Sequence, residues 1–360
     1  MSLVGRGADV GCALPPPPPP PPGAEIAYEV FRFLGILILT LIGLIFITFL
    51  IGRVVPIDPV LAVLGDRAPP EAYERVRQEL GIDLPVYQQF WIYLLKVVRG
   101  DFGTSAMTSQ PVLYDLGQFF PATLELATAA TLIGVVIGIP LGVIAATNRG
   151  RWIDHLTRVI GLVGYSIPIF WMGLIGLLVF YSWLDLVAGP GRLDIAYDGL
   201  VEPVTGLITI DSAMSGDWDV FFNALSHLIL PASLLGYLTL AYVSRMTRSF
   251  MLAQLNQEYI LTARAKGMTE RRVVWRHALG NIVVPLITVV ALSYASLLEG
   301  AVLTETVFAW PGLGLYITRS LFNADMNAVL GGTMLIGAIF VCLNVFCDML
   351  YRLLDPRART

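Results

Sequence analysis

The chain has 360 residues, of which 56% are hydrophobic and only 14% are charged. A mean hydropathy of +0.72 excludes an ordinary soluble globular protein. Several apolar runs reach about 20 residues, enough to cross a ~30 Å hydrocarbon core, so we expect an all-α polytopic membrane protein.

The N-terminal segment, residues 1–31, is expected to be a disordered tail. It holds eight consecutive prolines, Pro15–Pro22. Such a run forms a polyproline II rod of about 25 Å at ~3.1 Å per residue and is incompatible with a helix interior. A recognition motif for a proline-binding partner is the alternative.

The first transmembrane helix is expected within residues 32–55, where Phe33–Val55 is apolar. A long outer loop, residues 56–118, follows it. Two amphipathic stretches rich in aromatic residues predict two helices there, which end at Gly81 and Gly100. This loop is therefore expected to form a small helical cap on the external face.

The remaining core, residues 119–357, holds five further apolar spans, which makes six in all. They are expected at Thr123–Thr147, Leu156–Leu184, Leu228–Met251, Ile282–Leu303 and Val329–Leu353. Proline lies inside several of them, and membrane helices tolerate proline when neighbouring helices satisfy the freed backbone groups. The spans should therefore pack as a bundle.

The distribution of charge predicts the orientation. Lys and Arg gather before the first span, in the 148–151 loop, in the 245–276 region and at the C-terminus. The loop 185–227 instead holds one Arg against seven Asp or Glu. Because cytoplasmic loops carry the excess of basic residues, both termini are expected in the cytoplasm.

A basic segment, residues 256–281, separates the fourth and fifth spans. Five of the 23 Lys and Arg residues lie within 13 positions here. Gly267 can take the left-handed conformation that ends a helix, and Thr269 is a suitable N-cap for the next one. The segment therefore predicts a cytoplasmic helix, a glycine turn and a second helix.

Three interpretations of this segment compete. A solvated loop with lipid-headgroup contacts explains the charge but not the two-helix pattern. A DNA-binding helix-turn-helix has a similar length, but both ends run directly into membrane spans and leave no free recognition helix. A docking element for a cytoplasmic partner fits both the charge and the pattern.

Ionisable and polar residues within the spans are candidates for a translocation path. Glu125 and Glu299 lie near the outer ends of the second and fifth spans, and Glu299 could either bond a neighbouring helix or meet a substrate ammonium. The path candidates are Glu299, Tyr294, Ser296, Tyr165 and Ser166.

The stretch FAWPGLG, residues 308–314, follows the fifth span and combines a proline with two glycines. It predicts a non-helical re-entry or an outer gate, because such backbone survives at membrane depth only when it is buried in protein or lines water. The gate candidates are Trp310, Pro311, Gly312 and Gly314.

Sequence motifs for nucleotide or metal chemistry are missing. The chain has no G-x-x-x-x-G-K-[ST] loop, no H-E-x-x-H, no zinc-spaced Cys/His set and no G-x-S-x-G. The three histidines are interpreted as ordinary interfacial residues. The chain is therefore expected to be non-catalytic, and its energy source must be a partner or an ion gradient.

Several collinear motifs between residues 30 and 357 resemble the permeases of bacterial ABC importers, in the variant typical of the dipeptide/oligopeptide class. They are LGIDLPVYQQF, RGDFGTS, YSIPIFWMGL, YILTARAKGMTERRVVWRHALGNIVVP, LTETVFAWPGLG and LLDPR. Together they look like the first of the two permeases that such systems encode. The general importer signature has Glu-Ala-Ala where this chain has Leu261, Thr262 and Ala263, and that departure resembles the peptide class.

The resemblance implies an importer-permease (MetI-like) bundle in which the basic segment is a coupling helix that sits in a groove of a cytoplasmic ATPase. Gly267 would make the turn that meets the ATPase. The coupling residues that it implies are Ala263, Arg264, Ala265, Lys266, Gly267, Arg271 and Arg272. It also implies three kinds of partner: a similar second permease in a heterodimer, two ATPase subunits that carry ATP and Mg, and an external substrate-binding protein. No cofactor or nucleic acid is expected on this chain.

The sequence is therefore interpreted as the permease subunit of an ATP-driven importer for di- or oligopeptides in the bacterial inner membrane. Nickel, glutathione or an oligosaccharide are alternative substrates. An ion-coupled secondary transporter is the alternative class, but it would need ion ligands on broken helices and an internal repeat, and no clear repeat is found. The lack of a soluble domain argues against a signalling or DNA-binding protein.

Overall fold

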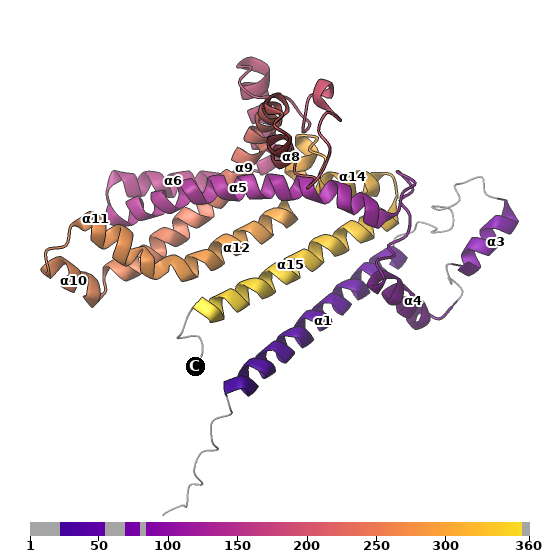
Figure 1. The fold of residues 1–360 in the computed structure, drawn as a ribbon, viewed down its shortest axis with the longest axis horizontal. Helices are drawn as coiled ribbons and strands as arrows, with labels where there is room; N and C mark the ends of the chain where they lie inside the picture. The colour runs from indigo at the N-terminus through magenta and orange to yellow at the C-terminus, as the bar shows by residue number, and fades with distance from the viewer. Residues whose placement is uncertain (1–21, 55–68, 80–83, 355–360) are drawn as a thin grey trace, which may run out of the picture.

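The computed structural model describes residues 22–54, 69–79 and 84–354, and this part of the chain is predominantly helical. Five of its helices are long and apolar enough to cross a membrane, and a bent pair makes six if it counts as one span. Figure 1 shows an elongated bundle. The long helices are α1 (Pro22–Val54), α5 (Val112–Thr147), α6 (Trp152–Ser166), α9 (Trp218–Leu255), α12 (Val283–Gly300) and α15 (Met326–Leu354).

Helices α5 and α9 pack along one another in the centre of the bundle. Gly134, Gly138 and Gly142 recur every four residues on the face of α5 that meets α9. A Cβ atom at Gly142 would lie 2.6 Å from the backbone oxygen of Ser244, and one at Gly138 would lie 3.2 Å from that of Leu240. Small residues at this spacing allow two membrane helices to make backbone contact.

The third span is not the single helix that the apolar run 156–184 predicts. It consists of α6 and α7 (Ile169–Gly176), which meet at an angle of 99°. Ile167 is extended because the residue before Pro168 is sterically disfavoured in the helical region. A π-helical stretch, Leu177–Trp183, continues α7.

The first helix begins earlier than expected. α1 starts at Pro22, so the predicted tail does not extend to residue 31. Proline is tolerated at the first helical position, where its missing N–H has no partner in any case. The other seven prolines of the run lie outside the described residues.

The predicted cap contains two helices, α3 (Pro70–Glu79) and α4 (Val86–Val98), as expected. One face of α4 packs between α1 and α15, through Phe90, Tyr93, Leu94 and Val97 against Ile45 and Met334. Gly100 has a φ of 78° and ends α4 as predicted, while Gly81 lies outside the described residues. The cap is shorter than 56–118 because α5 already begins at Val112.

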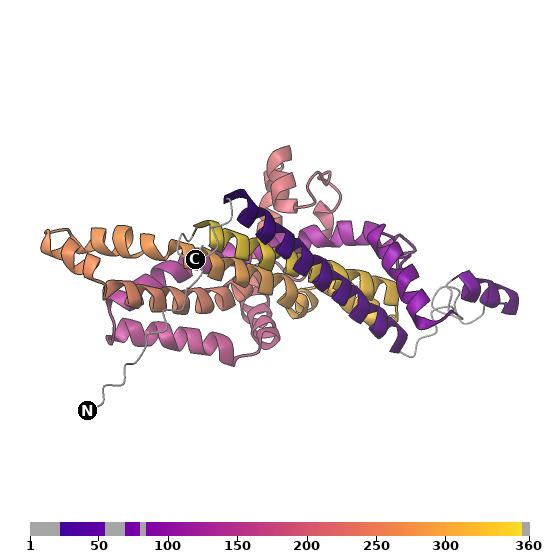
Figure 2. The same ribbon diagram turned by 90° about the horizontal axis from the view of Figure 1, so that it is seen from below.

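The basic segment lies at one end of the bundle, in α10 (Glu258–Ala265) and α11 (Glu270–Arg272). The first turn of α1 and the last turn of α15 lie toward that same end in both views, whereas α4 lies toward the other (Figures 1 and 2). This arrangement agrees with the predicted orientation, in which both termini share the side of the basic segment. The remaining short helices are Ile195–Tyr197, α8 (Ile208–Ser215), Gly280–Ile282, α13 (Val302–Val307) and α14 (Leu313–Phe322).

Candidate functional site

The basic segment folds as two short helices around a glycine turn, as predicted. α10 is terminated by Gly267, whose φ of 74° is in the left-handed region. The N–H of Gly267 bonds to the carbonyl of Arg264 at 2.9 Å, and the N–H of Met268 bonds to that of Ala263 at 3.2 Å. This is the Schellman arrangement, which satisfies the last carbonyls of the helix and fixes the direction in which the chain leaves it.

One face of the segment packs onto the ends of α5 and α9. The cluster comprises Val143, Ala146, Met251, Ile260, Ala263, Val273, Val274, Ala278 and Ile282. Ile260 and Val273 are fully buried, so their apolar surface holds the segment on the bundle at about 25 cal/mol per Å² removed from water. Ala263 therefore faces the bundle and not a partner, because this position lies on the inner face of α10.

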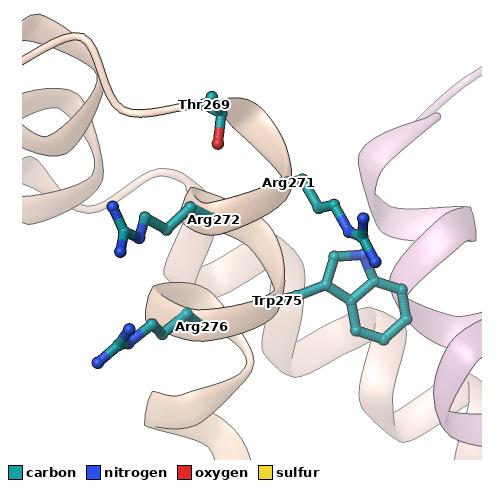
Figure 3. A pocket seen from close by; sticks show the side chains of 5 residues that line it. All are labelled: Thr269, Arg271, Arg272, Trp275 and Arg276. Carbon is teal, nitrogen blue, oxygen red and sulfur yellow. The ribbon is translucent and has the colours of Figure 1, made fainter.

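The opposite face is basic and exposed. Its exposed members are Arg264, Ala265, Lys266, Arg271 and Arg272. Figure 3 shows Arg272 and Arg276 pointing to the same side of the helix one turn apart, while Arg271 lies beside the indole of Trp275. A hollow of about 370 Å³ lies among Thr269, Arg271, Arg272, Trp275 and Arg276. This surface suits an acidic partner.

One ion pair spans the glycine turn. Arg264 Nε donates to Glu270 Oε1 at 2.8 Å, but both side chains are largely exposed. Such a pair contributes about 0–1 kcal/mol. Thr269 occupies the N-cap position, as predicted, although its side chain makes no capping hydrogen bond. The turn therefore owes its shape mainly to the backbone bonds at Gly267.

The second helix of the segment continues into the fifth span. From α11 the chain passes through a π-helical turn, Val273–Ala278, and a 3₁₀ turn, Gly280–Ile282, into α12. Residues Glu270–Leu298 together count as one membrane-spanning stretch. The basic segment is therefore continuous with α12.

The predicted outer-gate stretch is a buried, non-helical turn between α13 and α14. Ala309 has a φ of 47°, an uncommon value for a residue other than glycine. Trp310 is 1% exposed and its Nε1 donates to the carbonyl of Ala122 on α5 at 2.8 Å. The non-helical prediction is confirmed for residues 308–312 but not for Leu313 and Gly314, which already belong to α14. A gating role stays a prediction.

A carboxylate that the sequence analysis missed organises this turn. Glu305 of α13 is 0% exposed. Its Oε1 accepts the hydroxyl of Thr123 at 2.6 Å, and its Oε2 accepts the N–H of Leu315 at 3.0 Å. The Thr123 hydroxyl oxygen accepts the N–H of Leu313 at 2.8 Å. The carboxylate therefore satisfies backbone groups at the start of α14 and joins them to α5.

Two glycines, one in the turn and one at the start of α14, leave room for this carboxylate. A Cβ atom at Gly312 would lie 2.5 Å from Thr123 Oγ1, and one at Gly314 would lie 2.6 Å from Val302 Cα. The two glycines of the PGLG sequence are thus explained by close packing around Glu305.

A second buried carboxylate holds the outer loop, residues 185–217. Arg192 Nε and Nη2 donate to Glu125 Oε2 at 2.9 and 2.6 Å. The other oxygen, Oε1, accepts the hydroxyl and the N–H of Thr209 at 2.6 and 2.9 Å. The Arg192 guanidinium also lies 5.9 Å from the ring centroid of Trp310. The lone arginine of this acidic loop therefore joins it to both α5 and the buried turn.

Asp211 stabilises the same loop from within. Burial alone would raise the pKa of Asp211, but hydrogen bonds from the Thr205 hydroxyl and from the backbone N–H groups of Thr205 and Gly206 outweigh it and lower the pKa. Gly206 in turn accepts a bond from Arg192 Nη2 at 2.7 Å. The loop is therefore a connected structure and not a loose linker.

We expect Arg192→Lys to loosen the outer loop. A lysine cannot reproduce both donors to Glu125 and the bond to Gly206, and loss of such charged hydrogen bonds costs about 1.5–3 kcal/mol. Thermal melting of the purified protein and limited proteolysis within residues 185–217 should both show the effect. Arg319→Lys, at an exposed position of α14, is the control; equal melting of the two variants would contradict the assignment.

The path candidates come from two places in the bundle. Tyr165 and Ser166 are exposed at the end of α6, and Ser296 is exposed on α12. Tyr294 shares a hydrogen bond of 3.1 Å with Thr128 of α5. The side chain of Glu299 lies outside the described residues. Among the described hydrogen bonds none joins the α6 pair to the α12 residues, so a common path stays a prediction.

The structure also shows an ion pair near the basic end that the sequence did not predict. Arg248 belongs to the 245–276 region and was used above only to predict the orientation. Arg248 Nε and Nη2 donate to the two oxygens of Asp154 at 2.6 and 3.0 Å. Asp154 is 1% exposed and also accepts the N–H of Gly150 at 2.9 Å. The pair joins the start of α6 to α9.

The fold is that of a membrane permease of importer type. It resembles a solved structure of the methionine ABC transporter MetNI in inward-facing conformations, with a TM-score of 0.50 and 18% sequence identity. The match covers 69% of this chain and 100% of that chain.

Sequence comparisons define the family. The model of the binding-protein-dependent transport system inner membrane component matches residues 138–360, and its N-terminal companion matches residues 26–127. The probable D,D-dipeptide transport system permease protein DdpB of Escherichia coli (strain K12) is 46% identical over 89% of this chain and 94% of its own length. The di/tripeptide transport system permease protein DppB of Pseudomonas aeruginosa is 43% identical over 91% and 97%.

The chain therefore belongs to the family of binding-protein-dependent transport system inner membrane components. It is a multi-pass permease subunit of the bacterial inner membrane, and the family implies ATPase and substrate-binding partners. Membership in a family of permease subunits agrees with the predicted non-catalytic role.

Proposed function

We propose that this chain is the permease subunit of an ATP-driven importer of di- or oligopeptides. The observation that carries the proposal is the helix-Gly267-helix segment, which packs on α5 and α9 and continues into α12. The peptide substrate is supported by relatives between 41% and 46% identical, whose names refer to D,D-dipeptide, di/tripeptide and dipeptide transport.

The exposed face of the basic segment is the proposed contact with the ATPase. Arg264, Lys266, Arg271 and Arg272 present positive charge around the glycine turn, which complements an acidic rim. Ala265 is exposed between them, and its small side chain lets the ATPase approach the backbone closely. The proposal assigns ATP and Mg to the ATPase subunits and no cofactor to this chain.

The remaining partners follow from the architecture of such importers. A similar second permease completes the translocation path as a heterodimer. The external binding protein is received by the cap and by the outer loop, which the Glu125–Arg192 pair holds in a defined position.

The test is purification of this chain together with its native partners from the cells that make it, followed by uptake in proteoliposomes. We expect an ATPase to co-purify and radiolabelled dipeptide to accumulate only with ATP and the binding protein. Nickel, glutathione and an oligosaccharide serve as competing substrates. The proposal fails if no ATPase co-purifies, and its peptide part fails if one of the competitors is imported instead.

A further inference from the structure

Arg245 is an exposed arginine of α9, and it has no acidic partner among the described residues. Its guanidinium carbon lies 5.4 Å from the ring centroid of Tyr165 on α6 and 5.6 Å from that of Tyr242 on α9. The arginine is exposed and Tyr165 is 53% exposed. The guanidinium thus lies over two tyrosine rings, and no hydrogen bond joins it to another described side chain.

The helices that carry the two rings, α6 and α9, pack closely on one another. A Cβ atom at Gly164 would lie 3.0 Å from the ring of Tyr237, and the Tyr237 hydroxyl donates to the carbonyl of Ile160 at 2.6 Å. Aromatic faces orient a guanidinium while leaving its donor edge available. The geometry is therefore that of a prepared anion site.

Basic side chains outnumber acidic ones around Arg245 among the described residues. Asp154 lies at this α6–α9 contact and already pairs with two arginines. Its Oδ1 is 2.6 Å from Arg248 Nε and 3.7 Å from Arg158 Nε. Arg245 adds a further positive charge one turn from Arg248, on the side toward the middle of the span. This excess attracts an anion into the groove between the two helices.

The depth of the site argues against contact with lipid tails. Tyr165 follows Asp154 by 11 residues on α6, about 16 Å along the helix at 1.5 Å per residue. An arginine that reaches toward this level on a membrane helix faces a water-filled cavity or another protein, because exposure to hydrocarbon is costly. In a permease, a water-filled cavity at that depth is a candidate for the path of the transported molecule.

We infer that Arg245, held between Tyr165 and Tyr242, binds the carboxylate of the transported peptide on the inner half of the path. The inference rests on the proposed peptide import. A terminal carboxylate is common to peptides of any side-chain sequence, so one arginine serves them all. It matches the planar donor geometry that arginine offers to carboxylates.

The first experiment compares uptake of dialanine, in its L,L and D,D forms, with uptake of the corresponding C-terminal amides by the full reconstituted complex. A saturating concentration of peptide-loaded binding protein is used, so that the variants do not differ in how peptide is delivered to them. We expect Arg245→Gln to lower the maximal uptake of the free acids about tenfold or more, with the amides unchanged. Tyr165→Leu and Tyr242→Leu should lower free-acid uptake about two- to fivefold.

Arg149→Gln is the matched control. Arg149 is an exposed arginine of the 148–151 loop on the same side of the membrane, and its loss removes the same charge without touching the tyrosines. Equal losses in Arg245→Gln and Arg149→Gln would overturn the inference. A loss that appears only in vesicles with roughly a third phosphatidylglycerol, equally for acids and amides, would show a lipid-headgroup contact instead.

A second measurement does not depend on delivery by the binding protein. The nucleotide-free complex is treated with phenylglyoxal, which modifies arginine, and modification is read by mass spectrometry. Dialanine should protect Arg245 while its amide does not, and neither should protect Arg149. Absence of protection in a complex that imports dialanine overturns the inference alone, whereas a complex that imports no peptide overturns the proposed function and the inference with it.

Discussion

Gly267→Asp is expected to uncouple this permease from its ATPase. Gly267 has a φ of 74°, and no atom lies near the position of a Cβ. The substitution therefore causes no steric clash, and its cost within the chain is a backbone strain of about 1–2 kcal/mol. The introduced carboxylate would stand among the basic residues that meet an acidic partner. A loss of about 2–3 kcal/mol in docking corresponds to about 30- to 150-fold weaker binding.

Co-purification of the ATPase with the permease, its stimulated ATP hydrolysis and peptide uptake all measure this effect. Gly216→Asp is a matched control, because Gly216 also ends a helix with a φ of 79° and has nothing near its Cβ position. It lies in the outer loop, so it should leave ATPase association intact. Normal association and uptake in the Gly267 variant would refute the docking role.

Gly314→Ala is expected to be among the most destabilising single-methyl changes in the described part of the chain. The new Cβ would lie 2.6 Å from Val302 Cα and 2.9 Å from Glu305 Oε2. The first neighbour is backbone and cannot rotate away, and the second is a fully buried carboxylate. Overpacking of this kind costs about 1–3 kcal/mol, and the displaced hydrogen bonds of Glu305 add to it.

Gly300→Ala makes the same chemical change where nothing lies within 4 Å of the new atom. It should be neutral or stabilise α12 by up to about 1 kcal/mol, since alanine favours helix. Melting temperature and the yield of folded protein in detergent compare the two variants. Similar melting would show that the turn around Glu305 adapts, against the packing described here.

Short sequence patterns were sufficient to predict much of this architecture. Apolar runs located the spans, Gly100 and Gly267 marked real helix ends, and proline with glycine in 308–314 indicated a non-helical turn. Each of these features is decided within a few residues by steric rules. The bend at Pro168 was missed, because proline inside a membrane helix is compatible with both a kink and a complete break.

The buried carboxylates could not be predicted from pattern. Glu125 meets Arg192, 67 residues away, and Glu305 meets Thr123, 182 residues away. Such pairs depend on how distant helices are placed, which no local periodicity specifies. The nearest available signal was compositional: a single arginine in an otherwise acidic loop is a candidate for a specific partner.

The glycine stripe on α5 has a mechanical consequence. Gly134, Gly138 and Gly142 bring two helix backbones into contact, and closely packed backbones resist sliding because they have few alternative arrangements. The basic segment packs on the ends of both helices. If the proposed ATPase contact displaces the turn of this segment, α5 and α9 are therefore expected to move as one unit. The change of shape would then fall at the break around Pro168 and at the turn around Ala309.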